Sequence, residues 1–380
     1  PDWLELVMLD VADALTGTVL EEAPIVPVSA FSGEGLEDLK SLLVEKLQAK
    51  GVHPDDARPR LAVDRVFTLS GFGTVATGTL TGGSLSLGDQ VDIVPGKQKA
   101  RVRGLQTHKR KLTTALPGSR VAINLSGIDH SDIQRGQVIA KPGTTSDSIL
   151  VDVSYRHLVD AGAALKHNMQ VKLFVGAAEV LARTRVLGKQ EILPGEEGWL
   201  QLALSEPVAA ARGDRFILRR PSPPATLGGG LILDLHPGRR HRRFRSQIVN
   251  RLETLAEGSP EDLVYLTLSR RQPVAERDLI NLSGLDSETA RPLLVGMIDQ
   301  GRVRDVNGLL ITASGWQEIR AKMNQALAAY HDSNPLRLGM PREELRSRLK
   351  LKTPMFNSLI AESIDQKTVR AEGSLLRTAD

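Results

Sequence analysis

The stretch that decides the fold spans residues 64–79 and reads DRVFTLSGFGTVATGT. Two β-branched runs flank a turn, and glycines at 71, 73 and 78 allow backbone conformations and close approaches that a Cβ would block. Together these features predict an antiparallel hairpin. Comparable short runs at 90–94, 99–105 and 120–125, separated by glycines, extend the pattern to about residue 140 and predict an all-β barrel.

A second β-rich region follows, from residue 148 to residue 235. Its expected strands lie at 150–155, 170–175, 182–187, 198–204 and 215–218. We therefore predict two β-barrels in tandem.

Helical patterns stand on both sides of the barrels. Before them, a helix at 4–15, an apolar strand at 25–28 and a helix at 35–47 suggest an αβα fragment of a doubly wound sheet, and a polar linker with prolines occupies 51–59. After Pro237, helical periodicity is expected from Arg239 onward. Helices at 274–282 and 286–299 around a tight turn, with a hairpin at Asn307-Gly308, then predict a winged helix. A similar order recurs from Trp316 in segments 316–330, 341–349, 353–362, 368–371 and 374–376.

Composition sets further bounds. The chain of 380 residues is 41% hydrophobic and carries a net charge of +4, which suits a polyanionic partner without requiring one. It has no cysteine, and its eight histidines never fall at the spacing of a helical metal site, so no metal is implied. No stretch is apolar enough to span a membrane, and a cytoplasmic location is expected. Because the chain begins at Pro1 and ends soon after Leu375-Leu376, we expect both ends to be truncated.

The hairpin stretch and its continuation, Gly82-Gly83 and residues 87–91, resemble the second domain of translational GTPases of the elongation factor Tu class. Val28-Ser29-Ala30 resembles the last guanine-contacting motif of the G domain in that class, which makes Ser29 and Ala30 its expected remnant; the alternative is an ordinary turn. The sequence has no G-x-x-x-x-G-K-[ST] loop and no Asn-Lys-x-Asp motif. We therefore expect this chain not to bind or hydrolyse GTP by itself.

Within that class, the sequence resembles the selenocysteine-specific translation elongation factors. The resemblance rests on Asp64-Arg65, the stretches 74–79, 120–127, 213–216 and 226–230, and the appended winged helices. It implies GTP-dependent delivery of selenocysteinyl-tRNA to the ribosome at recoded stop codons, with GTP and Mg²⁺ bound by the intact family protein. It also implies recognition of a messenger RNA hairpin through further winged helices, which are absent here, so that this chain is the part that holds the tRNA.

The resemblance divides the chain into five parts. These are a C-terminal remnant of the GTPase domain at 1–50, a domain 2-like barrel at 58–143, a domain 3-like barrel at 147–236, a first winged helix at 240–314 and a second, truncated one at 315–380. We thus expect a multidomain chain that combines an α/β G-domain remnant, two antiparallel β-barrels and α+β winged helices.

Three residues match the family's pocket for the aminoacyl group, namely Asp64, Arg65 and Arg120. Two guanidiniums there favour a selenolate, which is ionised at neutral pH, over the neutral hydroxyl of serine. The alternative is that Asp64 and Arg65 cap a strand and that Arg120 pairs with an acidic neighbour.

A row of basic residues is the candidate contact for the tRNA backbone. Alternation along a strand places four cations on one face, and a basic loop follows; the set is Lys97, Lys99, Arg101, Arg103, Lys109 and Arg110. Such rows neutralise phosphates, and the aromatic content of only 3% favours double-helical RNA over stacked single strands. A solvated strand face is the alternative for each residue.

Two other features leave their roles open. The arginine-rich segment 239–245 either grips RNA or keeps a junction helix soluble. The expected recognition helix carries Asp286, Glu288 and Asp299, which disfavour phosphate contact, so the two winged helices are interpreted as a spacer arm. Another translational GTPase of the same class and a winged-helix nucleic-acid-binding regulator remain the alternative functions.

Overall fold

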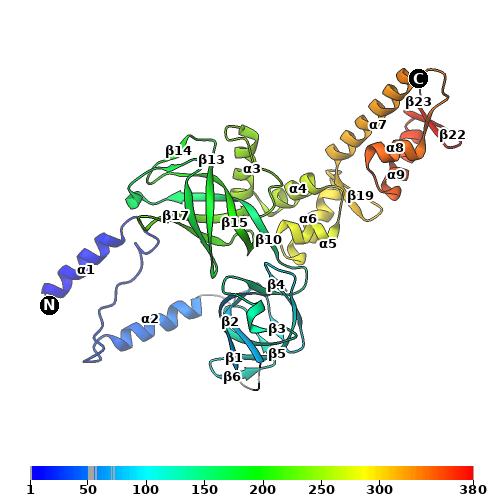
Figure 1. Ribbon diagram of the computed structural model, residues 1–380. Helices are drawn as coiled ribbons and strands as arrows, with labels where there is room; N and C mark the ends of the chain where they lie inside the picture. Colours follow the sequence, from blue (N-terminus) through cyan, green and yellow to red (C-terminus); the bar gives the residue numbers. More distant parts are fainter. Residues whose placement is uncertain (1, 50–54, 56–57, 70, 72, 380) are drawn as a thin grey trace. The chain divides into compact units, whose positions relative to one another are not determined.

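The computed structural model describes residues 2–49, 55, 58–69, 71 and 73–379. Its contacts separate the chain into two compact units, residues 1–54 and residues 55–380. Figure 1 shows the order of their elements along the chain. The linker predicted at 51–59 lies mostly outside the described residues, and Ser70 and Phe72 of the stretch 64–79 also lie outside them.

The first unit contains two helices, α1 (Asp2–Leu15) and α2 (Leu36–Ala49), as predicted. The strand predicted at 25–28 is wrong, because residues 24–29 form no regular secondary structure. A buried strand needs hydrogen-bonded neighbours, and none of the described residues of this unit forms a strand. Val28 is accordingly 48% exposed.

The first β-region forms a seven-stranded sheet in the order β4-β9-β1-β2-β8-β5-β6, and an additional pairing of β4 with β5 closes six of the strands into a ring. The strands are β1 (Arg60–Leu69), β2 (Gly73–Thr81), β4 (Gln90–Val94), β5 (Lys99–Thr107), β6 (Arg110–Leu112), β8 (Arg120–Ser126) and β9 (Val138–Ala140). Two short strands, β3 (Leu85–Ser86) and β7 (Thr114–Ala115), pair separately. The prediction of a barrel is confirmed.

The deciding stretch forms the β1–β2 hairpin, with Leu69 opposite Gly73 and Arg60 opposite Thr81. Gly71 and Gly73 have φ of +80° and +84°, a region that side chains rarely adopt. A Cβ at Gly78 would collide with the backbone carbonyl of Ala62, so the pairing itself requires glycine there. The register shifts between Val63 and Arg65, which makes Asp64 the extra residue of a β-bulge.

The second β-region is a closed barrel in the order β10-β15-β13-β12-β16-β17. Its strands are β10 (Ser146–His157), β12 (Gln170–Val175), β13 (Ala178–Leu187), β15 (Glu197–Ala210), β16 (Arg215–Arg220) and β17 (Ala225–Asp234), with a side pair of β11 (Leu165–Lys166) and β14 (Glu191–Ile192). All five strands predicted here are present. A small apolar cluster joins this barrel to the first: Val94, Val138, Ala140 and Ala209.

Helices follow the second barrel: α3 (Ser246–Glu257), α4 (Pro260–Arg271), α5 (Glu276–Ser283) and α6 (Ser287–Asp299), with β18 (Val274–Ala275) and the hairpin β19 (Val303–Val306) and β20 (Leu309–Thr312). The predicted helix-turn-helix and hairpin are present. The helix predicted to start at Arg239 is wrong, because the first helix begins at Ser246. Residues 239–241 are instead tied to the second barrel: Gln201 Nε2 donates to the Arg239 carbonyl at 3.2 Å, and its Oε1 accepts from the His241 amide at 2.9 Å.

The second winged helix consists of α7 (Ala313–Ser333), α8 (Arg342–Leu349) and α9 (Thr353–Asp365), with strands β21 (Met340–Pro341), β22 (Val369–Glu372) and β23 (Leu375–Thr378). One apolar core continues from the first wing into it and includes Val306, Ile311 and Trp316. Glu362 of α9 accepts from Trp316 Nε1 at 3.0 Å and from Arg304 of the first wing at 3.0 Å. The two winged helices are therefore packed as one piece.

The glycine run in β17 supports a test of the second barrel. A Cβ at Gly230 would overlap the backbone carbonyl of Ser154 on β10, and a backbone atom in a closed barrel has little room to move. We expect Gly230→Ala to lower the free energy of unfolding by about 1–3 kcal/mol. Denaturant titration followed by circular dichroism measures this.

The matched control is Gly296→Ala in α6, where an added Cβ meets no atom within 4 Å. Alanine there is expected to stabilise its helix by about 0.5–1 kcal/mol. Equal effects of the two substitutions would contradict the packing argument.

Candidate nucleic-acid interface

An ion pair on the first barrel brings two of the predicted pocket residues together. Arg120 donates from both terminal nitrogens to Asp64, at 2.5 Å and 3.0 Å, and Thr77 Oγ1 donates to the same carboxylate at 2.8 Å. The bulge positions Asp64, and β8 begins at Arg120, opposite Thr79 of β2. The contact thus depends on the register of three neighbouring strands.

The third residue, Arg65, is exposed beside this pair. Partial burial opposes ionisation of Asp64, but hydrogen bonds from Thr77 and Arg120 and the charges of Arg120 and Arg65 hold its pKa below the usual value. One carboxylate therefore faces two guanidiniums, and the cluster keeps a net positive charge. The alternative interpretation expected Arg120 to pair with an acidic neighbour, and it does. That neighbour is Asp64, which belongs to the predicted pocket as well.

A cavity of about 490 Å³ opens beside Asp64, between the two barrels. Charged side chains line it from both sides: Arg60, Asp64 and Arg135 from the first barrel, Asp214 and Arg215 from the second. Arg60 and Asp214 form a bidentate ion pair across it at 2.7 and 2.8 Å. This ion pair was not predicted from the sequence. The stretch 213–216 was used only for the family resemblance, and no partner was assigned to Asp214.

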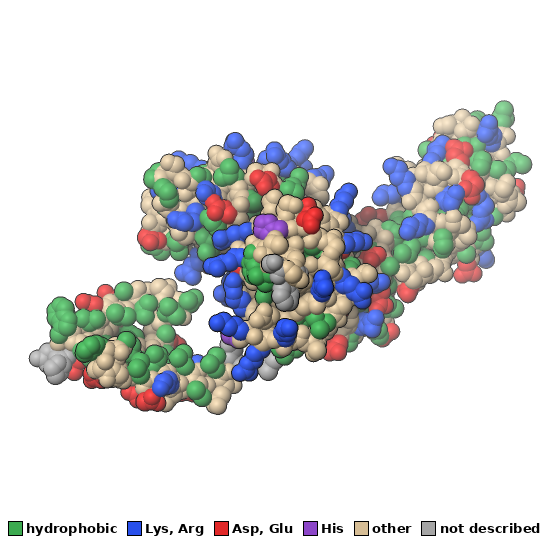
Figure 2. All heavy atoms as spheres, turned by 60° about the horizontal axis from the view of Figure 1, so that its bottom comes forward, with side chains coloured by type: hydrophobic (Ala, Val, Ile, Leu, Met, Phe, Trp, Pro, Cys, Tyr) green, Lys and Arg blue, Asp and Glu red, His purple; other side chains and the backbone are tan. Residues whose placement is uncertain are grey.

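The basic row lies mainly on β5, whose residues alternate between exposed and buried. Lys99, Arg101 and Arg103 are exposed, whereas Ala100 and Val102 between them are buried. Lys97 is exposed just before the strand, Lys109 lies in the β5–β6 turn, and Arg110 is the first residue of β6. Thr107 Oγ1 donates to the Arg120 carbonyl at 2.8 Å, so the end of this row adjoins the start of β8. In Figure 2, Lys and Arg side chains are numerous over the barrels and acidic ones fewer.

Ser29 and Ala30 lie in the first unit, in a turn that precedes α2. The Ser29 amide donates to the Glu34 carbonyl at 2.9 Å, and the Ser29 hydroxyl accepts from the Ser32 amide at 3.1 Å. The predicted turn after an apolar segment is present, although the strand before it is not.

Of the arginines in segment 239–245, Arg243 is engaged with the protein itself. Its guanidinium donates to the carbonyls of Val186, Lys189 and Gln190 at 2.7–3.1 Å. It therefore serves to attach the junction segment to the barrel.

Neither a metal cluster nor a membrane helix is found in the described part of the chain. Within residues 2–49, 55, 58–69, 71 and 73–379, no three His, Asp or Glu side chains are grouped so as to hold a metal ion. The helices in those ranges are all too short or too polar to cross a membrane.

Three family models match the chain. Elongation factor Tu domain 2 matches residues 73–140, the β-barrel domain of selenocysteine-specific elongation factor matches 152–239, and the winged helix of elongation factor SelB matches 325–377. Two tandem barrels, the first of them like domain 2 of elongation factor Tu, define a translation elongation factor of that class.

Relatives narrow the class. The selenocysteine-specific elongation factor of Desulfomicrobium baculatum is 34% identical over 383 residues, covering 99% of this chain and 60% of that protein. Its counterpart from Escherichia coli is 27% identical, covering 93% and 54%. The chain belongs to the family of selenocysteine-specific elongation factors, and it spans a little more than half the length of these relatives.

Solved structures agree on the fold. A bacterial selenocysteine-specific elongation factor, EF-Sec, matches with a TM-score of 0.78 at 22% identity, over 99% of this chain and 59% of that one. Elongation factor SelB from Methanococcus maripaludis in its apo form matches with a TM-score of 0.53 at 26% identity, over 62% and 55%.

The Asp64–Arg120 pair can be tested by its pH dependence. Because the folded-state pKa of Asp64 lies below its unfolded value, the pair stabilises the fold above about pH 4, and this contribution is lost as pH falls through the lowered pKa. We expect Asp64→Asn to cost roughly 0.2–1 kcal/mol of unfolding free energy at pH 7. Denaturant titrations of both proteins at pH 7 and near pH 3 measure the difference, which should be smaller at the lower pH because more of the Asp64 carboxyl is protonated there. A cost that is the same at both would refute the pairing.

Proposed function

We propose that this chain holds selenocysteinyl-tRNA for GTP-dependent delivery to the ribosome at recoded stop codons. The observation that carries the proposal is the Asp64–Arg65–Arg120 cluster, one carboxylate and two guanidiniums on a barrel of the elongation factor class. A net positive pocket attracts the ionised selenolate more strongly than the neutral serine hydroxyl. Selectivity for the aminoacyl group then arises from charge.

The parts of the chain have distinct roles in this proposal. The division is that expected from the sequence: residues 58–143 bind the aminoacyl end, 147–236 complete the tRNA-holding surface, and 240–314 and 315–380 form the spacer arm. The basic row on β5 contacts the tRNA backbone, since its cations are exposed on one face. Contact with a messenger RNA hairpin is assigned to further winged helices of the family protein.

GTP and Mg²⁺ are assigned to the intact family protein. Ser29 and Ala30 are the residues that we assign to guanine contact. The sequence contains no glycine-rich loop to hold the phosphates, so no hydrolytic step is attributed to its residues.

The aminoacyl preference is tested with Arg65→Gln, because Arg65 is exposed and its replacement leaves the Asp64–Arg120 pair in place. We expect the ratio of affinities for selenocysteinyl-tRNA over seryl-tRNA to fall about tenfold, the loss of one charge-assisted contact. Protection of the aminoacyl ester from hydrolysis measures both affinities. Contributions from the tRNA backbone cancel in the ratio.

Arg219→Gln, an exposed charge on β16, is the control and should leave the ratio unchanged. Equal affinity of the unaltered chain for both tRNAs would contradict the proposed specificity for selenocysteinyl-tRNA and would favour the function of another GTPase of the same class. Sequence-specific binding to duplex DNA would favour the winged-helix regulator instead.

The basic row is tested by salt dependence. The double substitution Lys99→Gln and Arg103→Gln removes two exposed cations from β5. The slope of log K against log salt should fall by about 2, and all tRNAs should be weakened alike, since phosphate contacts carry no sequence information. Filter binding at several salt concentrations measures the slope. The control is Lys322→Gln, which removes an exposed cation from α7. If the double variant changes the slope no more than this control does, the exposed face of β5 does not contact the tRNA backbone.

A further inference from the structure

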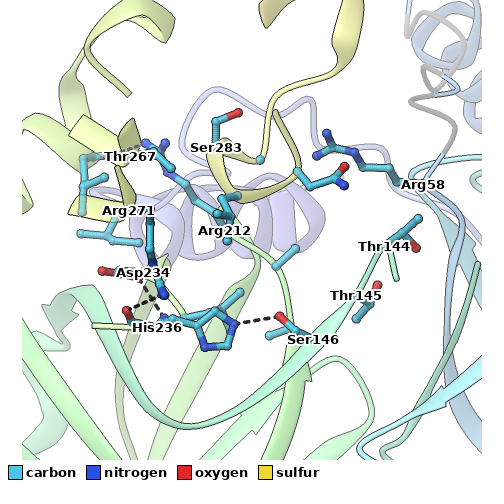
Figure 3. Close-up of a pocket in the computed structure, with 18 of the residues that line it drawn as sticks. Arg58, Thr144, Thr145, Ser146, Arg212, Asp234, His236, Thr267, Arg271 and Ser283 are labelled. Atoms are coloured by element: carbon cyan, nitrogen blue, oxygen red, sulfur yellow. Dashed lines mark hydrogen bonds between the residues drawn. The ribbon is translucent and has the colours of Figure 1, made fainter. Parts of the chain in front are cut away.

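A concave site lies where the first barrel, the second barrel and helices α3–α5 meet, all within the second unit. It has a volume of about 260 Å³, far above the roughly 10–15 Å³ that one water molecule needs. Figure 3 shows its labelled side chains arranged around the opening, with Arg58 and Arg271 on opposite sides and Arg212 between them. A multi-atom ligand can therefore enter.

The lining is strongly basic. Among the described residues that form it, the one carboxylate is Asp234, while the arginines are Arg58, Arg60, Arg212, Arg251, Arg270 and Arg271. We call this site the arginine junction. Two further carboxylates stand behind it, since Asp214 pairs with Arg60 and Asp152 with Arg251. Asp234 is thus the carboxylate within the described lining, and Asp214 and Asp152 each reach it through one arginine.

The carboxylate in the lining is shared. Asp234 pairs with both Arg251 and Arg270, and its charge also acts on Arg212. Arg212 donates to the Leu255 carbonyl, and Arg271 donates to the His236 carbonyl at 3.3 Å. These carbonyl contacts leave the positive charge of both groups in excess.

This excess of positive charge has an energetic cost. Burial lowers the pKa of Arg212, and burial together with the charge of Arg270 lowers the pKa of Arg251. A bound anion would raise both pKa values again, because its negative charge stabilises the charged guanidiniums in place of the water that burial removed.

A hydroxyl donor is also available. In the described structure, Thr145 Oγ1 is buried without a hydrogen-bond partner, and Thr145 lines the junction. A buried hydroxyl without a partner costs free energy, and an anionic oxygen would satisfy it. The neighbouring Ser146 hydroxyl lies 2.8 Å from His236 Nε2 and is already engaged.

We propose that the arginine junction binds a phosphoryl group, held by Arg212 and Arg271 with a hydroxyl contact from Thr145. Guanidiniums form bidentate hydrogen bonds that fit phosphate geometry. Because the lining comes from two barrels and the helices that follow, the bound group stabilises their junction. The inference is independent of the aminoacyl pocket, and loss of tRNA selectivity would leave it intact.

The test uses the full 380-residue chain, with phosphate and pyrophosphate titrated by calorimetry at constant ionic strength. We expect saturable binding of one anion per chain, about tenfold weaker in Arg271→Gln, which alters an exposed side chain at the end of α4. Arg277→Gln on α5 removes the same charge from an exposed position outside the lining and should bind like the unaltered chain. Thr145→Val, which keeps the shape but removes the hydroxyl, should also weaken binding.

The proposal is overturned if no saturable binding occurs, or if Arg271→Gln and Arg277→Gln weaken it equally. A thermal melt adds a readout that folding defects cannot imitate: pyrophosphate should raise the Tm of the unaltered chain and of Arg277→Gln more than that of Arg271→Gln.

The source of the phosphoryl group is decided with a short RNA duplex. If the RNA backbone occupies the junction, pyrophosphate competes with the duplex and Arg271→Gln weakens RNA binding by the same factor. If the occupant is a free anion, RNA affinity is unaffected by either change while pyrophosphate binding still depends on Arg271. Both results support the phosphoryl site, and absence of pyrophosphate binding refutes it.

Discussion

The buried carboxylate of Asp152 fixes how the helices leave the second barrel. Its side chain is fully buried, and a buried charge is tolerated only with partners on several sides. Gln201 of β15 donates to it at 2.9 Å, His241 Nε2 lies 2.7 Å away and Arg251 of α3 donates at 3.3 Å. A strand, the junction segment and the first helix therefore meet at one group. Removing any of these partners would expose the remaining charges to an apolar barrel, so the junction has one favourable arrangement.

Charge is handled differently on the first barrel. There Asp64 is reached by solvent and its partner Arg120 is more than half exposed, so the ion pair contributes little to stability. What the pair does is orient a guanidinium next to a second one at Arg65. Aspartate–arginine pairs thus have different roles on the two barrels. The buried Asp152–Arg251 pair holds α3 against the second barrel, whereas the solvent-exposed Asp64–Arg120 pair is part of a positive surface on the first.

Most strands of both barrels could be predicted because alternation and glycine breaks are local signals, but β9 and β17 were not expected as strands. The Asp64–Arg120 contact could not be derived from pattern, since the two residues are 56 positions apart and meet only through a bulge and the pairing of β2 with β8; resemblance to the family grouped them. Tertiary contacts also explain the errors. Hydrogen bonds with Gln201 hold residues 239–241 in an irregular path where periodicity suggested a helix. The segment 25–28 is apolar like a strand, but it pairs with no strand among the described residues of its unit. Helix α4 was not predicted.

The shared core of the two winged helices has a mechanical consequence. The 21-residue helix α7 spans about 30 Å. Near its start, the ring nitrogen of Trp316 donates a hydrogen bond to Glu362. The same carboxylate accepts a hydrogen bond from Arg304 in the wing of the first winged helix. The start of α7 is therefore held to the first wing by side-chain contacts as well as by the chain itself, and we expect a force on the second winged helix to reach the first one directly.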